Sequence, residues 1–325
     1  MPYNLCIVII NYNTPHLLLD CLKSLLPETD SNMVVVIVDN ASKDASVTTI
    51  NKWILKNSPV DRIKLISSSV NTGFSGGNNI GIKSVKANHY LLLNSDTLVR
   101  KGAIKKLLDT LSQDKTAGLI SPRLEWPDGI SQESCFKYHT PISEFIGSAK
   151  TGLITKLFRS FVVAQPVVDR RCNYSWVSFA CVMIKAEVFD DIGLMDEGYF
   201  MYFEDVEFCH RAKMSGWEIV CEPSAHVVHL RGGSSPLKAQ AKLRKRLPRY
   251  FYESRTRYFF QVYGGIGLLS ANLLWTFGWL ISSVRGVLSG SYRSDTSEKQ
   301  WRDIWINFSN PEKPYIHPDD YGNKA

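Results

Sequence analysis

One carboxylate and one pair of carboxylates in this sequence have neighbours that suit them to metal binding or proton transfer. Asp96 follows an apolar run and stands directly after Asn94 and Ser95. A carboxylate in such a place can hold Mg²⁺ or Mn²⁺, which keep several waters and take further oxygens from a diphosphate. The alternative for Asp96 is a helix N-cap.

The second group is the pair Glu204 and Asp205, which stands among aromatic residues at 199–203. Partial desolvation by these rings would raise the pKa of a carboxyl towards that of a useful general base. Attraction to a helix N-terminus explains such acidic residues equally well. His229, in the run VVHLRGGS, is a further candidate, although a strand histidine is more often structural.

Polar side chains also follow each of four apolar runs, at residues 11–13, 39–42, 71–79 and 94–96. If the runs are parallel strands, these clusters converge on the rim where such sheets bind ligands. Polar surface loops are the alternative for any single cluster. Gly73 begins a glycine-rich stretch that either lets the backbone approach a phosphate or forms a tight turn into a helix.

The elements that must position these residues alternate between strand and helix. Buried strands are predicted at 5–10, 33–38, 62–67 and 90–93, and helices at 15–26, 46–56, 80–86 and 104–111. This alternation predicts a doubly wound, mostly parallel α/β sheet. The first strand is followed by NYNT in place of G-x-G-x-x-G, and G-K-[ST] is absent, which disfavours dinucleotide-binding and P-loop folds.

The pattern changes after residue 118. We expect a hairpin turn at Asp128-Gly129, a mobile loop over 140–172 and a strand over 175–184. A helix over 205–214 and short strands at 218–221 and 225–229 should follow.

Charge divides the chain into an expected catalytic domain, 1–235, and a basic, aromatic helical region, 236–325. The last 90 residues hold 14 Lys and Arg against 7 Asp and Glu, whereas the rest holds 24 of each sign. Residues 262–284 carry no charge and are long enough to span a bilayer, although their glycines leave an interfacial or buried hairpin open. The basic region suits an anionic membrane surface, with a solvated helix face as the alternative.

The seven cysteines form no C-x-x-C pair and several lie in apolar runs. They are typical of buried side chains in a reducing compartment. The N-terminus lacks the basic flank and long apolar run of a signal peptide. We therefore expect a cytoplasmic protein, peripheral to the inner face of the cytoplasmic membrane, with a single span left open.

Taken together, these segments resemble family 2 glycosyltransferases of the GT-A fold, especially their rhamnosyltransferase-like branch. The matching pieces cover about residues 5–235 in order. They are VIINYNT (8–14), VDNAS (38–42), NTGFSGGNN (71–79), LLNSDT (92–97), DGISQES (128–134), MDEGYFMYFEDVEFCHR (195–211) and VVHLRGGS (227–234).

The resemblance implies roles for individual residues. Asp39 resembles the residue that reads the nucleotide base, Asp96 the second acid of the D-x-D metal motif, and His229 the second metal ligand. Asp205 resembles the catalytic base, with Glu204 beside it. The remaining donor-binding candidates are Asn11, Asn13, Asn71, Gly73, Asn78, Asn94 and Ser95.

The sequence departs from the family pattern at two positions. Asn94 replaces the first acid of D-x-D, and Phe179 stands where the family usually has glycine, near the expected acceptor pocket.

The predicted function is therefore a metal-dependent, inverting hexosyltransferase. It would move a sugar, rhamnose being one candidate, from a nucleotide-diphosphate donor to a glycan or lipid-linked glycan in bacterial surface polysaccharide assembly. No nucleic acid is expected as a partner. One rival is a sugar-nucleotide nucleotidyltransferase, which needs a basic triphosphate loop near the first strand that is not visible here. The other is a non-catalytic binding module.

Overall fold

The computed structural model describes residues 2–57, 62–166, 168–231, 241–289 and 296–321. The chain forms two compact units. The first contains residues 1–136, 166–197 and 208–234, and the second contains 137–165, 198–207 and 235–325. The boundary predicted between 235 and 236 lies outside the described residues and stays a prediction.

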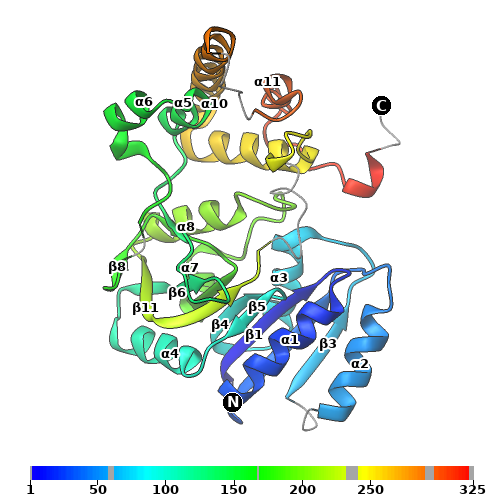
Figure 1. The fold of residues 1–325 in the computed structure, drawn as a ribbon. Helices are drawn as coiled ribbons and strands as arrows, with labels where there is room; N and C mark the ends of the chain where they lie inside the picture. The colour runs from blue at the N-terminus through cyan, green and yellow to red at the C-terminus, as the bar shows by residue number, and fades with distance from the viewer. Residues whose placement is uncertain (1, 58–61, 167, 232–240, 290–295, 322–325) are drawn as a thin grey trace. The chain divides into compact units, whose positions relative to one another are not determined.

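A mixed sheet forms the centre of the first unit, in the order β3-β2-β1-β4-β10-β6-β11-β5, with β8 beside β11 (Figure 1). The strands are β1 (Tyr3–Asn11), β2 (Met33–Asp39), β3 (Ile63–Ser67), β4 (Ala87–Asn94), β5 (Thr97–Val99), β6 (Ala117–Glu125), β8 (Cys172–Asn173), β10 (Cys181–Lys185) and β11 (Glu218–His229). β1–β4 pair in parallel, as do β6 and β11, whereas β10 and β5 run antiparallel to their neighbours. The predicted doubly wound, mostly parallel sheet is therefore confirmed.

Helices cover both faces of this sheet, which is why its central strands contain continuous apolar runs such as Leu5–Ile10 and Leu91–Leu93. α1 (Pro15–Leu25), α2 (Ser46–Asn57) and α4 (Ala103–Gln113) pack on the face that carries Leu5 and Ile7. α3 (Gly73–Ser84) and α7 (Ala186–Ile192) lie against the other face, where Gly81 meets Val8 and Phe189 meets Tyr90.

Several element boundaries differ from those predicted. α3 begins at Gly73, seven residues before the predicted helix, because the glycines lie in the helix itself. The strand predicted over 175–184 is broken into β9 (Trp176–Val177), which pairs with β7 (Cys135–Phe136), and β10. The two short strands predicted near 218–229 are one strand, β11, with irregular pairing after Glu222.

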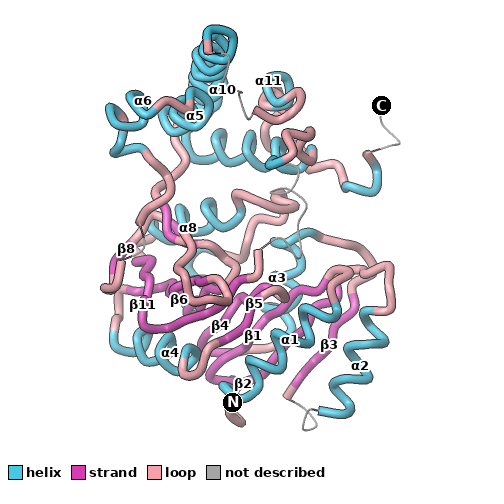
Figure 2. The backbone as a smooth tube through the Cα atoms, in the orientation of Figure 1, coloured by secondary structure: helices cyan, strands magenta, loops and turns pink. Residues whose placement is uncertain are grey.

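The second unit is largely helical in the part that the structure describes (Figure 2). The prediction of a mobile loop over 140–172 was wrong, because α5 (Pro141–Ala149) and α6 (Gly152–Leu157) lie there, followed by a short 3-10 turn, η2 (Arg159–Phe161). α5 has Pro141 in its first turn and a capping box between Thr140 and Ser143.

The uncharged run 262–284 lies within α10 (Arg249–Leu288), which consists of two helical segments that meet in a kink at Gly264. From residue 265 onward the run is a single helical segment and does not form a hairpin. Gly264 interrupts the helix with φ of 69°, a left-handed conformation that glycine adopts readily. α11 (Gln300–Asp303) and the 3-10 turn η3 (Pro318–Asp320) follow it. By length and composition α10 is able to cross a membrane.

Candidate active site

The polar clusters after β1, β2 and β3 meet at one edge of the sheet, as predicted. Asn11 Nδ2 donates to Asp39 Oδ1 at 2.8 Å, which joins the ends of β1 and β2. Asn40 Nδ2 donates to Asn71 Oδ1 at 2.9 Å and to the Gly73 carbonyl at 2.9 Å. The carboxyl ends of three neighbouring strands are therefore tied together by side-chain amides, which gives the rim a fixed geometry.

Asp39 organises the loop that follows its own strand. It is 1% exposed and accepts hydrogen bonds from the Ser42 hydroxyl at 2.7 Å and the Ser42 amide at 3.0 Å. Ala41 between them has φ of 62°, an uncommon conformation that this loop holds in place. Asn13, also at positive φ, accepts from the Lys43 amide at 2.7 Å, so the loops after β1 and β2 are held to one another.

The glycines of the third cluster serve helix packing. A Cβ at Gly81 would overlap the Val8 side chain, and one at Gly77 would lie 3.0 Å from Ile10. The Asn78 side chain donates to the Phe74 carbonyl within the same helix. Gly73 begins α3 with φ of 70°, which agrees with the predicted tight turn into a helix. The phosphate-binding alternative for this cluster stays a prediction.

The fourth cluster brings a buried carboxylate and an imidazole together. Asp96 is 1% exposed, and His229 Nε2 lies 3.5 Å from its Oδ1. The pairing of β5 with β11, with Thr97 opposite His229, sets this distance. Ser95 lies 3.3 Å from Thr14, hydroxyl to hydroxyl, which connects the cluster to the loop after β1. Asn94 ends β4.

The donor set at Asp96 fits a divalent cation. Neither carboxylate oxygen of Asp96 has a hydrogen-bond partner among the residues that the structure describes, and the same holds for Nδ1 of His229. All three atoms are buried. A buried, unpaired carboxylate is costly, and such groups usually pair with a charge or bind a metal. No cluster of three or more acidic, histidine or cysteine side chains suited to a metal occurs in the described part of the chain. An ion here would therefore need oxygens from water or a diphosphate, as Mg²⁺ commonly does.

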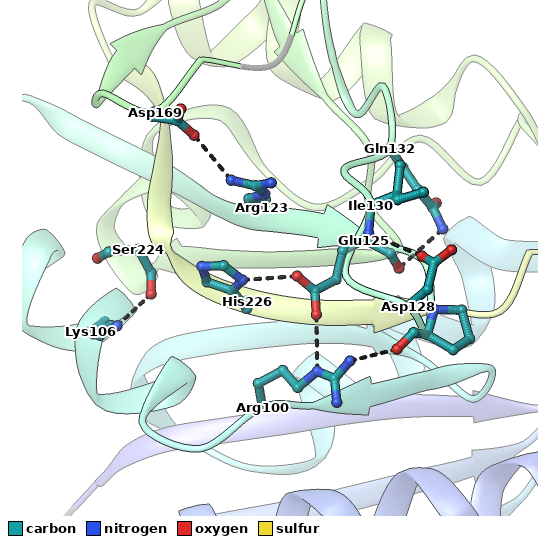
Figure 3. A network of polar contacts seen from close by, with 11 residues as sticks. Arg100, Lys106, Arg123, Glu125, Asp128, Ile130, Gln132, Asp169, Ser224 and His226 are labelled. Atoms are coloured by element: carbon teal, nitrogen blue, oxygen red, sulfur yellow. Dashed lines mark hydrogen bonds and ion pairs between the residues drawn. The ribbon is translucent and has the colours of Figure 1, made fainter.

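A network of hydrogen bonds and ion pairs holds together the strands next to Asp96 and His229 (Figure 3). Glu125, at the end of β6, accepts from Arg100 at 2.9 Å and contacts His226 Nδ1 at 2.8 Å. Burial acts to raise the pKa of the Glu125 carboxyl, but the hydrogen bonds from His226 and Arg100 outweigh it and hold the pKa below its usual value. This links β6, β11 and the residue after β5, and so fixes His229 relative to Asp96.

Gln132 is a residue of the site that we did not predict. The turn at Asp128-Gly129 is confirmed, with the Gly129 amide donating to the Trp126 carbonyl at 2.9 Å. Beyond the turn, buried Gln132 donates to the carbonyls of Glu125 at 3.1 Å and His229 at 2.7 Å. Its place in the polar run DGISQES was the available signal, but only the fold brings it to His229.

Glu204 and Asp205 belong to the second unit and begin α8 (Glu204–Met214). Tyr202 and Phe203 precede them with φ of 72° and 66°. Two bulky residues in succession in the left-handed region store strain, which is common at functional sites. This conformation leads the chain into α8, whose first two residues are Glu204 and Asp205.

The two carboxylates lie in different environments. Glu204 is buried, and its Oε2 has no hydrogen-bond partner among the described residues. Burial first, and then the charge of Asp205, raise the pKa of Glu204 well above its usual value. Asp205 is half-buried, and its Oδ1 accepts from the Val206 amide at 2.9 Å. Asp205 is therefore the more accessible carboxylate of the pair.

The aromatic residues expected around this pair are present in the second unit. The Phe203 ring lies 5.2 Å from His139, 5.4 Å from Tyr258 and 5.7 Å from Phe251, centre to centre. Phe179, the second departure from the family pattern, is buried in the first unit against Phe208 at 5.8 Å.

The model of the family described as Glycosyl transferase family 2 matches residues 6–140, which carry the rim and Asp96. Residues 6–140 belong to glycosyl transferase family 2. The predicted rhamnosyltransferase-like resemblance is confirmed, because several similar proteins carry that name.

Three relatives illustrate the likeness. A low-salt glycan biosynthesis hexosyltransferase, Agl10 of Haloferax volcanii, is 31% identical over 65% of this chain, which spans 62% of that relative. An N-acetylglucosaminyl-diphospho-decaprenol L-rhamnosyltransferase of Mycobacterium tuberculosis is 25% identical over 70% of this chain and 76% of its own. The dTDP-rhamnosyl transferase RfbF of Shigella flexneri is 26% identical over 72% of each chain.

Solved structures confirm the GT-A fold. GalNAc-T7 with UDP, GalNAc and Mn²⁺ has a TM-score of 0.54 at 18% identity, covering 90% of this chain and 58% of its own. The mannosyltransferase PcManGT of Pyrobaculum calidifontis, with GDP-Man and Mn²⁺, has a TM-score of 0.51 at 14% identity, covering 96% and 86%. Identities this low show the fold alone.

Proposed function

We propose that this protein is a metal-dependent, inverting glycosyltransferase that uses a nucleotide-diphosphate sugar. The observation that carries the proposal is the buried Asp96, whose two oxygens lack hydrogen-bond partners in the described structure and which faces His229 at 3.5 Å. Its position beyond the carboxyl end of β4 is where open α/β sheets bind ligands.

Asp96 and His229 would hold the divalent ion. Bound there, Mg²⁺ or Mn²⁺ would supply positive charge that stabilises the departing nucleoside diphosphate. The printed descriptions of GalNAc-T7 and PcManGT, which pair Mn²⁺ with UDP or GDP-Man, support this choice of cofactor.

The nucleoside would bind along the rim formed by the loops after β1, β2 and β3. Asp39 Oδ2 accepts one described hydrogen bond, from the Ser42 amide, and retains capacity for a base N–H or a ribose hydroxyl. Asn11 and Asn71 keep this carboxylate and its loop in place through the amide contacts described above. Asn13, Gly73, Asn78, Asn94 and Ser95 remain proposed donor contacts, and Asn78 would use its side-chain oxygen, since its Nδ2 donates to the Phe74 carbonyl.

Asp205 would act as the general base. It would take the proton of the acceptor hydroxyl while that oxygen attacks the anomeric carbon and the bond to the diphosphate breaks. One displacement inverts the anomeric centre and needs no covalent enzyme intermediate. Glu204 is poorly suited to this role at neutral pH, because its raised pKa favours the protonated form.

The acceptor that fits best is a lipid-linked glycan, and the site of action is the cytoplasmic face of a membrane. The name of the decaprenol-directed relative and the basic region 236–325 support this proposal. Rhamnose is a candidate sugar because two of the relatives described above are named as rhamnosyltransferases.

The test is nucleoside diphosphate release from a panel of nucleotide sugars, measured with Mn²⁺ and with excess EDTA. We expect slow hydrolysis of one donor with Mn²⁺, faster release with a sugar-bearing polyprenyl diphosphate as acceptor, and none with EDTA. Full release in EDTA would contradict the metal assignment. Release of pyrophosphate from a nucleoside triphosphate and a sugar phosphate would favour the nucleotidyltransferase instead.

A further inference from the structure

In the second half of α10 the exposed residues are apolar and polar residues are buried, which is the reverse of the usual arrangement. From Ile266 to Leu288, every exposed residue of this helix is apolar. The same helix buries Asn272, Gly278 and Ser282. Helices at the surface of water-soluble proteins show the opposite arrangement, with charged and polar residues on the outer face.

We call the exposed apolar residues of this segment the outer stripe. Ile266, Leu273, Leu280 and Val287 recur every seven residues, and Leu269, Phe277 and Val284 lie between them. Their exposed fractions run from 40% to 86%, so nothing in the described structure covers them.

α6 extends the outer stripe. Its Leu153 and Leu157, one helical turn apart, are 79% and 73% exposed. Phe158, just after α6, contacts Phe145 at 6.1 Å, and Phe145 stacks on Phe277 of the stripe at 5.6 Å. The apolar surface therefore continues from α10 across α5 to α6 within the second unit.

We propose that the outer stripe and the α6 leucines insert into the apolar layer of an anionic membrane, with the segment of α10 that follows Gly264 lying in the plane of that membrane. Charge favours lipid over a second copy of this chain. The region 236–325 carries a net charge of +7, so two copies would repel one another, whereas anionic headgroups attract it. Trp301 in α11 and Trp305 just after it are exposed, and tryptophan is enriched at membrane–water interfaces.

The buried side of α10 excludes a span. Asn272, near the centre of the uncharged run, accepts from Arg255 at 2.7 Å, and Arg255 pairs with Glu144 at 2.7 Å. Asp303 of α11, paired with Arg246 at 2.7 Å, precedes Ile304, which belongs to one core with Trp275. A spanning orientation would place these ion pairs at the bilayer centre, where charges are costly. Insertion in the plane leaves them on the protein side.

This inference rests on the proposed function only for the choice of membrane face, and its test does not need catalysis. Full-length protein is incubated with vesicles of phosphatidylcholine alone or with 30% phosphatidylglycerol, and binding is measured by flotation. We expect binding to the anionic vesicles. The double variant Leu273→Gln/Leu280→Gln should bind them at least about tenfold more weakly, since two apolar side chains lose their burial in lipid.

The matched control is Leu55→Gln/Met214→Gln, which changes two exposed apolar residues outside the stripe and should bind as the native protein does. Donor hydrolysis should be equal in all three proteins, which separates loss of membrane binding from loss of the catalytic site. No binding by native protein, or equal binding by the stripe variant, would overturn the inference. So would a native dimer in solution that the stripe variant converts to monomers.

Depth measurements test the orientation. Nitroxide labels are attached singly to Ile266→Cys, Phe277→Cys and Val287→Cys in a Cys172→Ser background, because the other six native cysteines are buried. Positions 266 and 287 are separated by about 32 Å along the helix. Equal, shallow depths at all three positions are expected. A maximum depth at 277, with both ends in water, would show a span and contradict the proposal.

Discussion

Replacing Asp96 with Asn should stabilise the protein alone and abolish its response to metal and nucleotide. Both carboxylate oxygens are buried without a hydrogen-bond partner in the described structure. An unsatisfied buried polar group costs about 1–3 kcal/mol, and more when it is charged. Removing the charge at constant volume should therefore raise the Tm by about 2–12 °C, at about 2–4 °C per kcal/mol for a unit of this size.

Ligand should act in the opposite direction on the native protein. A ligand at 100 times its Kd stabilises the folded state by about 2.7 kcal/mol, which is a rise of about 5–11 °C. The assay is a thermal melt with and without Mn²⁺ and a nucleoside diphosphate. We expect the native protein to show the rise and the Asn variant to show less than about 2 °C.

Asp39→Asn is the matched control, because Asp39 is as buried as Asp96 but accepts hydrogen bonds from Asn11 and Ser42. This variant should lose about 1–3 kcal/mol. A destabilised Asp96→Asn protein that keeps its full Mn²⁺ response would refute the reasoning.

Three further predictions follow from single positions. His229→Ala should raise the Mn²⁺ concentration for half-maximal turnover, but less than Asp96→Asn does, since a neutral ligand contributes less charge; an unchanged requirement would leave His229 a structural residue. Glu204→Gln should raise the Tm at pH 8 and have little effect near pH 4. The pKa of Glu204 is raised in the folded protein, so the stability of the native protein falls as pH rises from the pKa of the unfolded chain to that of the folded protein. A gain in Tm that is equal at both pH values contradicts this. Gly81→Ala should cost about 1–3 kcal/mol in urea unfolding, because its Cβ overlaps Val8, whereas Gly147→Ala, which has open space, should gain about 0.5–1 kcal/mol.

Sequence patterns predicted the first half of the fold well because its strands are buried on both faces. Met33–Asp39 is apolar up to its last residue, and a run of that kind does not show the helical spacing of apolar residues that would predict a helix instead. The rim residues could be placed for the same reason, since each cluster directly follows such a strand. Asn11 and Asp39 then meet because parallel strands end on one side.

The parts of the fold that could not be predicted depend on contacts between residues far apart in the sequence. Residues 140–172 lack a strong period, and α5 is fixed by its packing on α10, which follows it by more than a hundred residues. The glycines at 76 and 77 suggested a loop, because glycine is unfavourable inside a helix, and the fit of Gly77 against Ile10 depends on the folded sheet. Likewise, the contact between Gln132 and His229 joins positions 97 residues apart, and no local pattern encodes it.

The proposed chemistry depends most directly on Asp205. A base is needed for the chemical step and not for holding the donor, so its removal should lower kcat without weakening nucleotide binding. The measurement is single-turnover sugar transfer by native protein, Asp205→Asn and Glu204→Gln, with nucleotide affinity determined in parallel. We expect kcat to fall by roughly 10²–10⁴ in Asp205→Asn, at nearly unchanged affinity, while Glu204→Gln stays active. Activity that survives in Asp205→Asn but is lost in Glu204→Gln would assign the base to Glu204, and full activity in both would contradict base catalysis by this pair.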